Sequence, residues 1–597
     1  MERGSGGEVR TWLPILAILL LASAFYLRDI YRASFWEDES WMAIAIGGDL
    51  PHVWTFATER GVHPPLYFYL GWFYARLAGD GEVALRWLAG MCALVGIALT
   101  YRLSADWFGR RAGVYTALLT AGSLFLIYFG RLARHYTLFF ALAAALVLVY
   151  ERWAWHRGVM HHATHRYLIA IALLLAALLY THYFGVWMAL VIGLHGLIFL
   201  RGRDRLRLLV ALAISGLLFI PWIPSLLYQF NREGGLGYGT RVAEHALGAY
   251  LDRVFNGSYE LGIALALLGM LAVWRKPRAG VLLAFWIVLP ITFSLLLNAR
   301  FVWFVERNLI FTLSAAYLLF GAGLAWISQH RIGQVAPLLA SVAFVALGQV
   351  RYTDFWPFET PAWRDMANAI SWDSRPDDLY VINAEPYSLS YYLRRFMGAA
   401  PELIHVRDWL EQPMFSDRMW MIDASWAVRE EALAALPPNL TQTRRHVLGN
   451  LVTEFYQRAP AEPLTVFGDQ IALGVVDLPA QAASGQPLHL DLWWRALRQP
   501  DADYSVGIYL VAPDGRTVAQ QDGGFDRGQI PALALPQDRW TPDARSLTVP
   551  ADAPPGEYLL LAAVYDWRDG SRLTPQGGRE DNAYLLTVIE ITDQGNR

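Results

Sequence analysis

The chain has 597 residues, of which 55% are hydrophobic and 17% are charged, and its formal net charge is −3 at pH 7. A soluble protein of this length needs more surface charge, so the composition excludes an ordinary soluble enzyme. The small negative charge and the lack of a basic stripe exclude a nucleic-acid-binding protein, and the single cysteine, Cys92, excludes intramolecular disulfides and cysteine metal clusters.

Apolar runs dominate roughly the first 350 residues, and each run is near the length of about 20 residues that a spanning helix needs. The first run follows Arg3 and Arg10, as in a signal peptide, but no small-residue cleavage site follows it, so we expect a retained first span. The sequence predicts about eleven spans, at 11–28, 84–104, 112–130, 136–154, 166–182, 184–200, 206–228, 258–274, 279–297, 308–328 and 332–349.

The apolar segment Pro64–Ala78 is shorter and begins with Pro-Pro, which favours an interfacial helix. Charge supports this interpretation, because short cytoplasmic loops collect Lys and Arg. If the segment does not cross and the N-terminus lies inside, every inside loop is basic, and the C-terminal region lies outside. These inside loops hold Arg110-Arg111, 156–166, 201–207, 275–278 and Arg331.

The same topology brings polar clusters to the outer face of the membrane. They are Trp36–Glu39, His63–Pro65, Arg131–Tyr136 and Glu306–Asn308, with Tyr180–Phe184 at the same level. Ionisable residues at membrane depth are energetically expensive and usually functional. We therefore expect an active site on this face.

The acidic cluster and the first arginine cluster each have a chemical and a structural interpretation. Asp38 and Glu39 lie among aromatic residues, where a carboxylate with a raised pKa can act as a general base; alternatively they form a solvated loop that flanks the membrane. Arg131, Arg134 and His135 suit an anionic lipid phosphate, and the alternative is an anchor to lipid headgroups.

Arg307 has a similar pair of interpretations, because an ion pair with its neighbour Glu306 would satisfy its charge. His63 and His182 are candidate metal ligands, or structural histidines with hydrogen-bond partners. No H-E-x-x-H, P-loop or G-x-G-x-x-G pattern lies in a credible setting, which disfavours nucleotide-dependent chemistry at the inner face.

Several segments together resemble one family. Phe35–Ser40 resembles the acidic pair in the first outer loop of the GT-C glycosyltransferases, in the branch of the protein O-mannosyltransferases and aminoarabinose transferases. Further matching segments follow in the family's order, and the resemblance covers about residues 10–350 and returns at 361–364. These segments are His63–Tyr67, Gly79–Glu82, Ala84–Arg86, Trp107–Gly113 and Tyr180–Tyr183.

The resemblance implies a GT-C fold and transfer of a hexose or related sugar from a polyprenyl-phosphate donor, usually with inversion. The acceptor would be a protein, lipid or glycan at the outer face of the cytoplasmic membrane. In the acidic pair Asp38 and Glu39, Asp38 would be the base. Arg131, Arg134 and Arg307 would neutralise the leaving phosphate. The substrate pocket would hold His63, His135, Tyr136, His182 and Glu306.

One departure from the family concerns the second outer loop. Relatives commonly carry an acidic residue two positions before the arginine that matches Arg134, and here that position is Leu132. This puts a loop-bound divalent cation in doubt and leaves the metal open. Two other functions compete: a lipid or glycan transporter, although inverted repeats are missing, and a non-catalytic glycan-binding scaffold.

From about Arg351 the composition becomes that of a soluble protein. We expect three domains, at 1–350, 351–462 and 463–597: the membrane domain, a small α/β domain and a β-sandwich. In the α/β domain, strands at 379–382 and 419–422 should each precede a helix, at 387–395 and 428–435. In the sandwich, Trp493, Trp494 and Trp540 either bind carbohydrate or fill the core, and the core is favoured.

Overall fold

The computed structural model describes residues 5–155, 164–232, 243–298, 304–329, 335–355, 361–424 and 429–592. The chain divides into a helical unit, Met1–Arg364 with Tyr387–Arg395, and a second unit, Asp365–Pro386 with Phe396–Arg597, which holds the described strands. Arg331 and most of the expected basic loop 156–166 lie outside the described residues.

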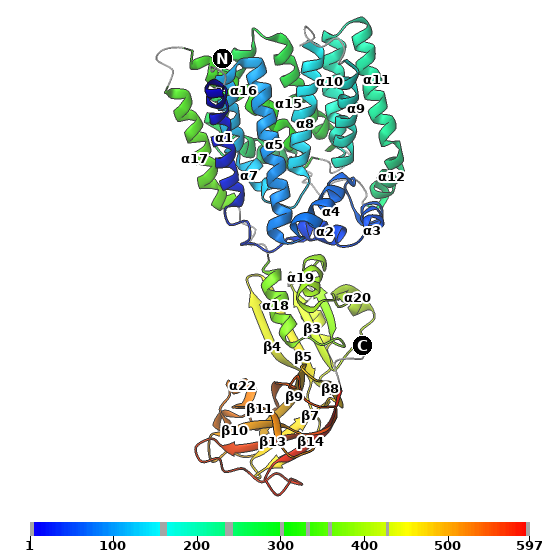
Figure 1. Ribbon diagram of the computed structural model, residues 1–597, viewed down its shortest axis with the longest axis vertical. Coiled ribbons are helices and arrows are strands. Elements are labelled where there is room, and N and C mark those ends of the chain that lie inside the picture. Colours follow the sequence, from blue (N-terminus) through cyan, green and yellow to red (C-terminus); the bar gives the residue numbers. More distant parts are fainter. Residues whose placement is uncertain are drawn as a thin grey trace. The chain divides into compact units, whose positions relative to one another are not determined.

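Long helices of the helical unit stand side by side, and three short helices, α2, α3 and α4, lie together at one end, which we call the site end (Figure 1). The helices are α1 (Ser5–Leu27), α2 (Glu37–Ile46), α3 (Leu50–Thr55), α4 (Leu66–Ala78), α5 (Glu82–Phe108), α6 (Arg110–Ala121), α7 (Leu124–Gly130), α8 (Tyr136–Trp155), α9 (Thr164–Thr181), α10 (Gly185–Phe199), α11 (Gly202–Phe219), α12 (Ile223–Arg232), α13 (Ala243–Val254), α14 (Tyr259–Val273), α15 (Pro277–Asn298), α16 (Leu313–Ile327), α17 (Ala336–Phe355) and α19 (Tyr387–Met397).

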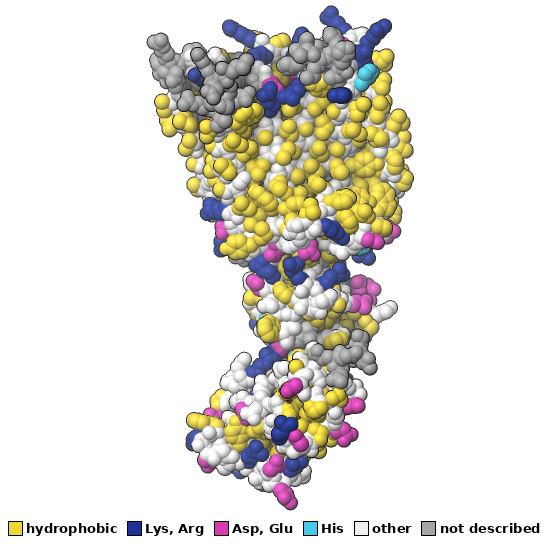
Figure 2. Space-filling view, in the orientation of Figure 1, with side chains coloured by type: hydrophobic (Ala, Val, Ile, Leu, Met, Phe, Trp, Pro, Cys, Tyr) yellow, Lys and Arg dark blue, Asp and Glu magenta, His cyan; other side chains and the backbone are white. Residues whose placement is uncertain are grey.

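This unit has the composition and helix lengths of a membrane protein. Six helical segments are long and apolar enough to cross a bilayer, two bent helix pairs pass the same test as pairs, and three shorter helices are also apolar. Each of these coincides with one of the predicted runs, whereas α4, with 13 residues, is too short to cross. Figure 2 shows the resulting hydrophobic band, bordered by charged side chains at both ends.

Helices α14 and α16 approach each other closely because both carry glycine at the contact. A Cβ atom added to Gly323 would lie 2.6 Å from the backbone nitrogen of Gly269, and one added to Gly269 would lie 2.3 Å from the Leu319 carbonyl oxygen. Helices in a bilayer gain little from hydrophobic association and instead pack through small residues. Helix α16 is buried along most of its length and forms the centre of the unit.

The second unit contains a mixed five-stranded sheet in the order β2-β1-β3-β5-β4, with β1, β2 and β3 parallel. Strands β1 and β3 form where the sequence predicted buried strands. The elements are α18 (Trp363–Asp373), β1 (Leu379–Asn383), β2 (Leu403–His405), α20 (Val406–Glu411), β3 (Arg418–Asp423), α21 (Arg429–Ala434), β4 (Leu440–Leu448) and β5 (Leu451–Arg458).

Two further sheets, β11-β10-β13-β14-β8 and β12-β9-β7-β6, face each other as a β-sandwich. Trp493 and Trp494 are buried, and the Trp494 indole donates to Asp543, so these two tryptophans are not available to a carbohydrate. The strands are β6 (Thr465–Phe467), β7 (Ile471–Val475), β8 (Gln481–Ala483), β9 (Pro487–Ala496), β10 (Tyr504–Val511), β11 (Thr517–Gly523), β12 (Thr541–Thr548), β13 (Gly556–Asp566) and β14 (Tyr584–Thr592), with the short helix α22 (Phe525–Gly528) between β11 and β12.

Candidate active site

The acidic loop at the site end begins helix α2. Trp36 is the residue before the first turn, and Glu37, Asp38 and Glu39 fill that turn, where carboxylates face the partial positive charge of the helix N-terminus. The side chain of Glu39 is fully buried, whereas that of Asp38 is 31% exposed. These different surroundings suit the two adjacent acids to different roles.

Glu39 forms a buried ion pair with Arg86 of α5. Nε and Nη2 of Arg86 donate to the two carboxylate oxygens of Glu39 at 2.8 and 2.7 Å. The backbone N–H of Ala133 donates to the same carboxylate at 2.9 Å. Glu39 therefore ties the start of α2 to α5 and to the loop that precedes α8.

Arg86 uses all five of its N–H donors. Besides the two bonds to Glu39, its Nη1 and Nη2 groups donate to the carbonyl oxygens of Ile30, Ala33 and Ser34 at 2.8, 2.8 and 2.9 Å. Lysine has three donors on one atom and could not serve this set. In the sequence, Arg86 was recognised only as part of a family motif, and its buried ion pair was not predicted. Its position at the start of an apolar run could have indicated the pair, because a charged residue there needs a buried partner.

Asp38 faces two guanidinium groups. Nη2 of Arg134 lies 3.4 Å from Oδ2 of Asp38, and Nη1 of Arg134 donates to the Asp38 carbonyl oxygen at 3.1 Å. Arg307 interacts electrostatically with the same carboxylate and with Tyr136. Among the described residues, the buried Nε of Arg134 has no hydrogen-bond partner. A partly exposed carboxylate can accept a proton here while the two arginines hold an anion.

The third candidate arginine, Arg131, lies apart from this pair. It is buried, and the charges that act on it belong to Asp29 and Arg28, on the loop after α1, and to Arg86 of α5. Burial lowers the pKa of Arg131 to about 10. Glu306 forms an ion pair with Arg253 of α13 at 2.8 Å, so its carboxylate does not serve Arg307 alone.

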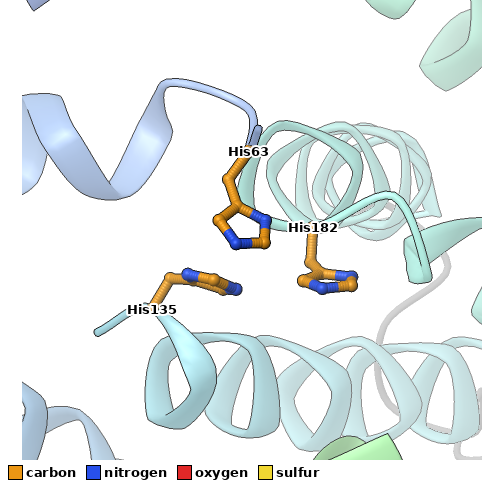
Figure 3. A group of neighbouring side chains, drawn as sticks. All are labelled: His63, His135 and His182. Carbon is orange, nitrogen blue, oxygen red and sulfur yellow. The ribbon is translucent and has the colours of Figure 1, made fainter. Parts of the chain in front are cut away.

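Three histidine side chains from separate segments meet at this site (Figure 3). His63 precedes α4, His135 precedes α8 and His182 follows α9, and their ring centroids are 4.4, 5.2 and 5.5 Å apart. One potential ligand nitrogen of each ring lies within 4.8 Å of the other two. The ring of Tyr136 contacts that of His135, with the centroids 4.4 Å apart and the ring planes tilted, and Tyr136 is itself buried.

These histidines are uncharged at neutral pH. Removal from water lowers the pKa of His182 to about 3 and lowers the pKa values of His63 and His135 well below their usual range. The charges of Arg134 and Arg307 act in the same direction, because a protonated imidazole would repel them. The cluster therefore presents neutral imidazole nitrogens.

Helix α19 covers the acidic loop, although it follows that loop by about 350 residues. The hydroxyl of Tyr392 accepts from the Phe35 N–H at 2.6 Å and donates to Glu82, and Ser40 donates to Ser388 at 2.9 Å. The sequence predicted this helix within the α/β domain, whereas Tyr387–Arg395 packs as part of the helical unit. No local signal in the sequence indicates this contact.

Comparisons with known proteins support the family resemblance that the motifs indicated. The family model for dolichyl-phosphate-mannose-protein mannosyltransferases matches residues 62–228. The crystal structure of ArnT from Cupriavidus metallidurans in the apo state is similar with a TM-score of 0.55 and 13% identity, over 75% of this chain and 98% of that chain. The same protein bound to undecaprenyl phosphate aligns with a TM-score of 0.50 and 13% identity, over 76% and 98%.

A second similar structure is the oligosaccharyltransferase of Archaeoglobus fulgidus in complex with Zn and sulfate. Its TM-score is 0.51 at 11% identity, over 97% of this chain and 100% of that chain. No curated protein matches the sequence. At these identities the likeness establishes a shared fold.

Proposed function

Because the chain has the fold of the GT-C glycosyltransferases, as its motifs predicted, we propose that it transfers a sugar from a polyprenyl-phosphate donor to an acceptor at the outer face of the cytoplasmic membrane. The observation that carries the proposal is a partly exposed carboxylate, Asp38, beside the guanidinium groups of Arg134 and Arg307. A transfer that releases a phosphate needs a base and a cation pair of this kind.

In the proposed reaction an acceptor hydroxyl attacks the anomeric carbon of the sugar. The bond between that carbon and the phosphate oxygen breaks, its electron pair stays on the phosphate, and the acceptor proton passes to Asp38. Arg134 and Arg307 stabilise the charge that develops on the leaving phosphate. Attack from the face opposite the phosphate inverts the anomeric configuration.

Glu39 has a positioning role in this proposal. Its two carboxylate oxygens accept from Arg86, from the Ala133 N–H and from the Trp36 N–H, and the side chain is fully buried. Because Ala133 lies next to Arg134, the ion pair sets the distance between Asp38 and Arg134. Arg131, whose charge is influenced by Asp29 and Arg86 and not by Asp38, is given no part in this step.

The remaining pocket residues contribute shape and polarity. Tyr136 and Glu306 hold the arginines through their electrostatic contacts with Arg307 and Arg253. The outward orientation is supported by the basic residues Arg110, Arg201 and Arg275, which open or precede α6, α11 and α15 and belong to the loops expected inside. The proposed donor sugar is a hexose or related sugar, and the proposed acceptor is a protein, a lipid or a glycan.

The test supplies membranes that contain the full-length chain with radiolabelled hexoses linked to polyprenyl phosphate and, in parallel, with nucleotide-linked hexoses. The proposal expects label to move from the polyprenyl carrier to a new product, and none to move from the nucleotide donors. If intact labelled lipid changes leaflets without chemical change, the chain is a transporter; if no label leaves any polyprenyl carrier, the proposal fails.

A further inference from the structure

The cluster of His63, His135 and His182 has the size of a mononuclear metal site. Tetrahedral zinc binds imidazole nitrogens at about 2.0–2.1 Å, which places two ligand nitrogens about 3.4 Å apart. One nitrogen of each ring already lies within 4.8 Å of the others. Small rotations of side chains that converge on one point, as Figure 3 shows, would complete the site.

A comparison within the same helical unit separates this cluster from an ordinary buried histidine. His195 is buried with both nitrogens engaged, Nδ1 with the Tyr150 hydroxyl at 2.8 Å and Nε2 with the Arg278 carbonyl oxygen at 3.1 Å. In contrast, Nε2 of His135 is buried and has no hydrogen-bond partner among the residues described. An unpartnered buried nitrogen costs free energy unless something binds it.

The other two members differ in what a metal would displace. Nδ1 of His182 accepts the Phe184 N–H at 3.1 Å and the His182 ring is also hydrogen-bonded to the Asn308 side chain, so a metal must replace one of these two partners. His63 is partly exposed and gives the site access.

The charges around the cluster determine what must accompany the metal. Arg134 and Arg307 act electrostatically on all three histidines, so they also repel a bare dication. An anion between the metal and the two guanidinium groups would remove this repulsion. A phosphate oxygen fits both requirements, because it can fill the open position of a three-ligand metal and accept from arginine.

We propose that His63, His135 and His182 bind one divalent transition-metal ion of the zinc class, whose open coordination position takes a phosphate oxygen. Three imidazoles without a carboxylate select such a metal over magnesium or calcium, which prefer oxygen ligands. The metal site rests on the geometry of the histidines, and the identity of the phosphate as the donor's rests on the proposed function. The acidic residue that relatives carry at the position of Leu132 is then not needed, because the three histidines hold the metal.

The experiment uses full-length protein in lipid nanodiscs, purified with an affinity tag that contains no histidine. After removal of metal with a chelator, cobalt(II) is titrated in with no addition, with inorganic phosphate, or with a short-chain polyprenyl phosphate, and its visible absorption is recorded. Zinc content is measured separately by mass spectrometry. The variants are His135→Ala, His63→Ala and the control His52→Gln, which removes an exposed histidine from α3.

Wild type and His52→Gln should bind one metal per chain with the absorption of tetrahedral cobalt. His135→Ala and His63→Ala should lose more than about 100-fold in affinity, beyond the loss typical of changes to residues that only support ligands. Phosphate should raise cobalt affinity by about 5- to 150-fold, the usual range of coupling between two sites. A response to both additions identifies the phosphate group as the ligand, and a response to the lipid alone identifies the lipid-linked phosphate.

Absence of zinc and cobalt under all three conditions would overturn the inference, as would unchanged binding by a well-folded His135→Ala variant. If neither inorganic phosphate nor the polyprenyl phosphate changes the affinity for cobalt, the proposed binding of a phosphate oxygen at the open coordination position is wrong. These results are independent of sugar transfer: a chain that binds zinc but moves no sugar contradicts only the proposed function, and a chain that moves sugar without metal contradicts only this inference.

Discussion

Substitution of Glu39 by Gln tests whether the two adjacent acids have different roles. The change keeps the size of the side chain and removes its charge. The amide oxygen can still accept one bond from Arg86, but the amide NH₂ group faces an Arg86 donor that previously met a carboxylate oxygen at 2.7 or 2.8 Å. The guanidinium, whose side chain is 2% exposed, loses its counter-ion.

The expected effect follows from this burial. Removal of one partner from a buried ion pair costs about 3–5 kcal/mol, because the other charge stays buried and uncompensated. The three carbonyl oxygens that also accept from Arg86 still stabilise its charge, which reduces the cost in free energy, but none of them carries a full negative charge. We expect the lower half of that range, about 3 kcal/mol, which changes the unfolding equilibrium more than 100-fold by the relation of about 1.4 kcal/mol per tenfold.

The assay is thermal unfolding in detergent, followed by the loss of the monodisperse peak in size-exclusion chromatography. Glu39→Gln should unfold at least about 5 °C below wild type, and Arg86→Lys should fall similarly because it lacks donors for the carbonyl oxygens. The control is Asp38→Asn, next in the sequence but partly exposed, which should unfold near the wild-type temperature. If Glu39→Gln and Asp38→Asn unfold at the same temperature as wild type, the positioning role is refuted.

Two other substitutions test the anion site and the helix contact. Arg134→Ala should lower the rate of sugar transfer by about 10²–10³-fold, because it removes a donor to the leaving phosphate; a rate within threefold of wild type would contradict this. Gly323→Val should destabilise the fold by about 1–3 kcal/mol through overpacking against Gly269, measured as a lower unfolding temperature. Gly216→Val in α11, where an added Cβ meets nothing within 4 Å, is its control, and equal shifts for the two variants would contradict the packing argument.

The apolar helices could be predicted from the sequence because a bilayer demands long uninterrupted apolar runs. Every predicted run corresponds to a helix, a bent pair or a shorter apolar helix of the structure. The acidic cluster was located from the order of the spans and was expected on a loop, whereas in the structure Asp38 and Glu39 lie in the first turn of α2, a position that carboxylates favour. Segments of alternating apolar and polar residues, separated by turn sequences, indicated the β-sandwich.

The roles within the site could not be predicted, because they depend on contacts between distant residues. Asp38 and Glu39 are adjacent in the sequence, but Glu39 pairs with Arg86, which lies 47 residues beyond it, whereas Asp38 faces Arg134. Arg131 and Arg134 lie in the same short segment and could not be distinguished from the sequence, yet their side chains have different neighbours in the structure. The sequence indicated His63 and His182 as candidate metal ligands and His135 as a pocket residue, and only the fold shows that His135 lies beside the other two.

Sugar release from a polyprenyl phosphate by Asp38→Asn, measured against a matched control, tests the central claim most directly. The control is Asp252→Asn: Asp252 is 35% exposed and lies 3.4 Å from Arg351, as Asp38 is 31% exposed and lies 3.4 Å from Arg134. Reconstituted wild type and Asp252→Asn should release polyprenyl phosphate from labelled donor at equal rates, and Asp38→Asn about 10²–10⁴-fold more slowly. Equal rates for all three proteins would contradict the assignment of Asp38 as the base.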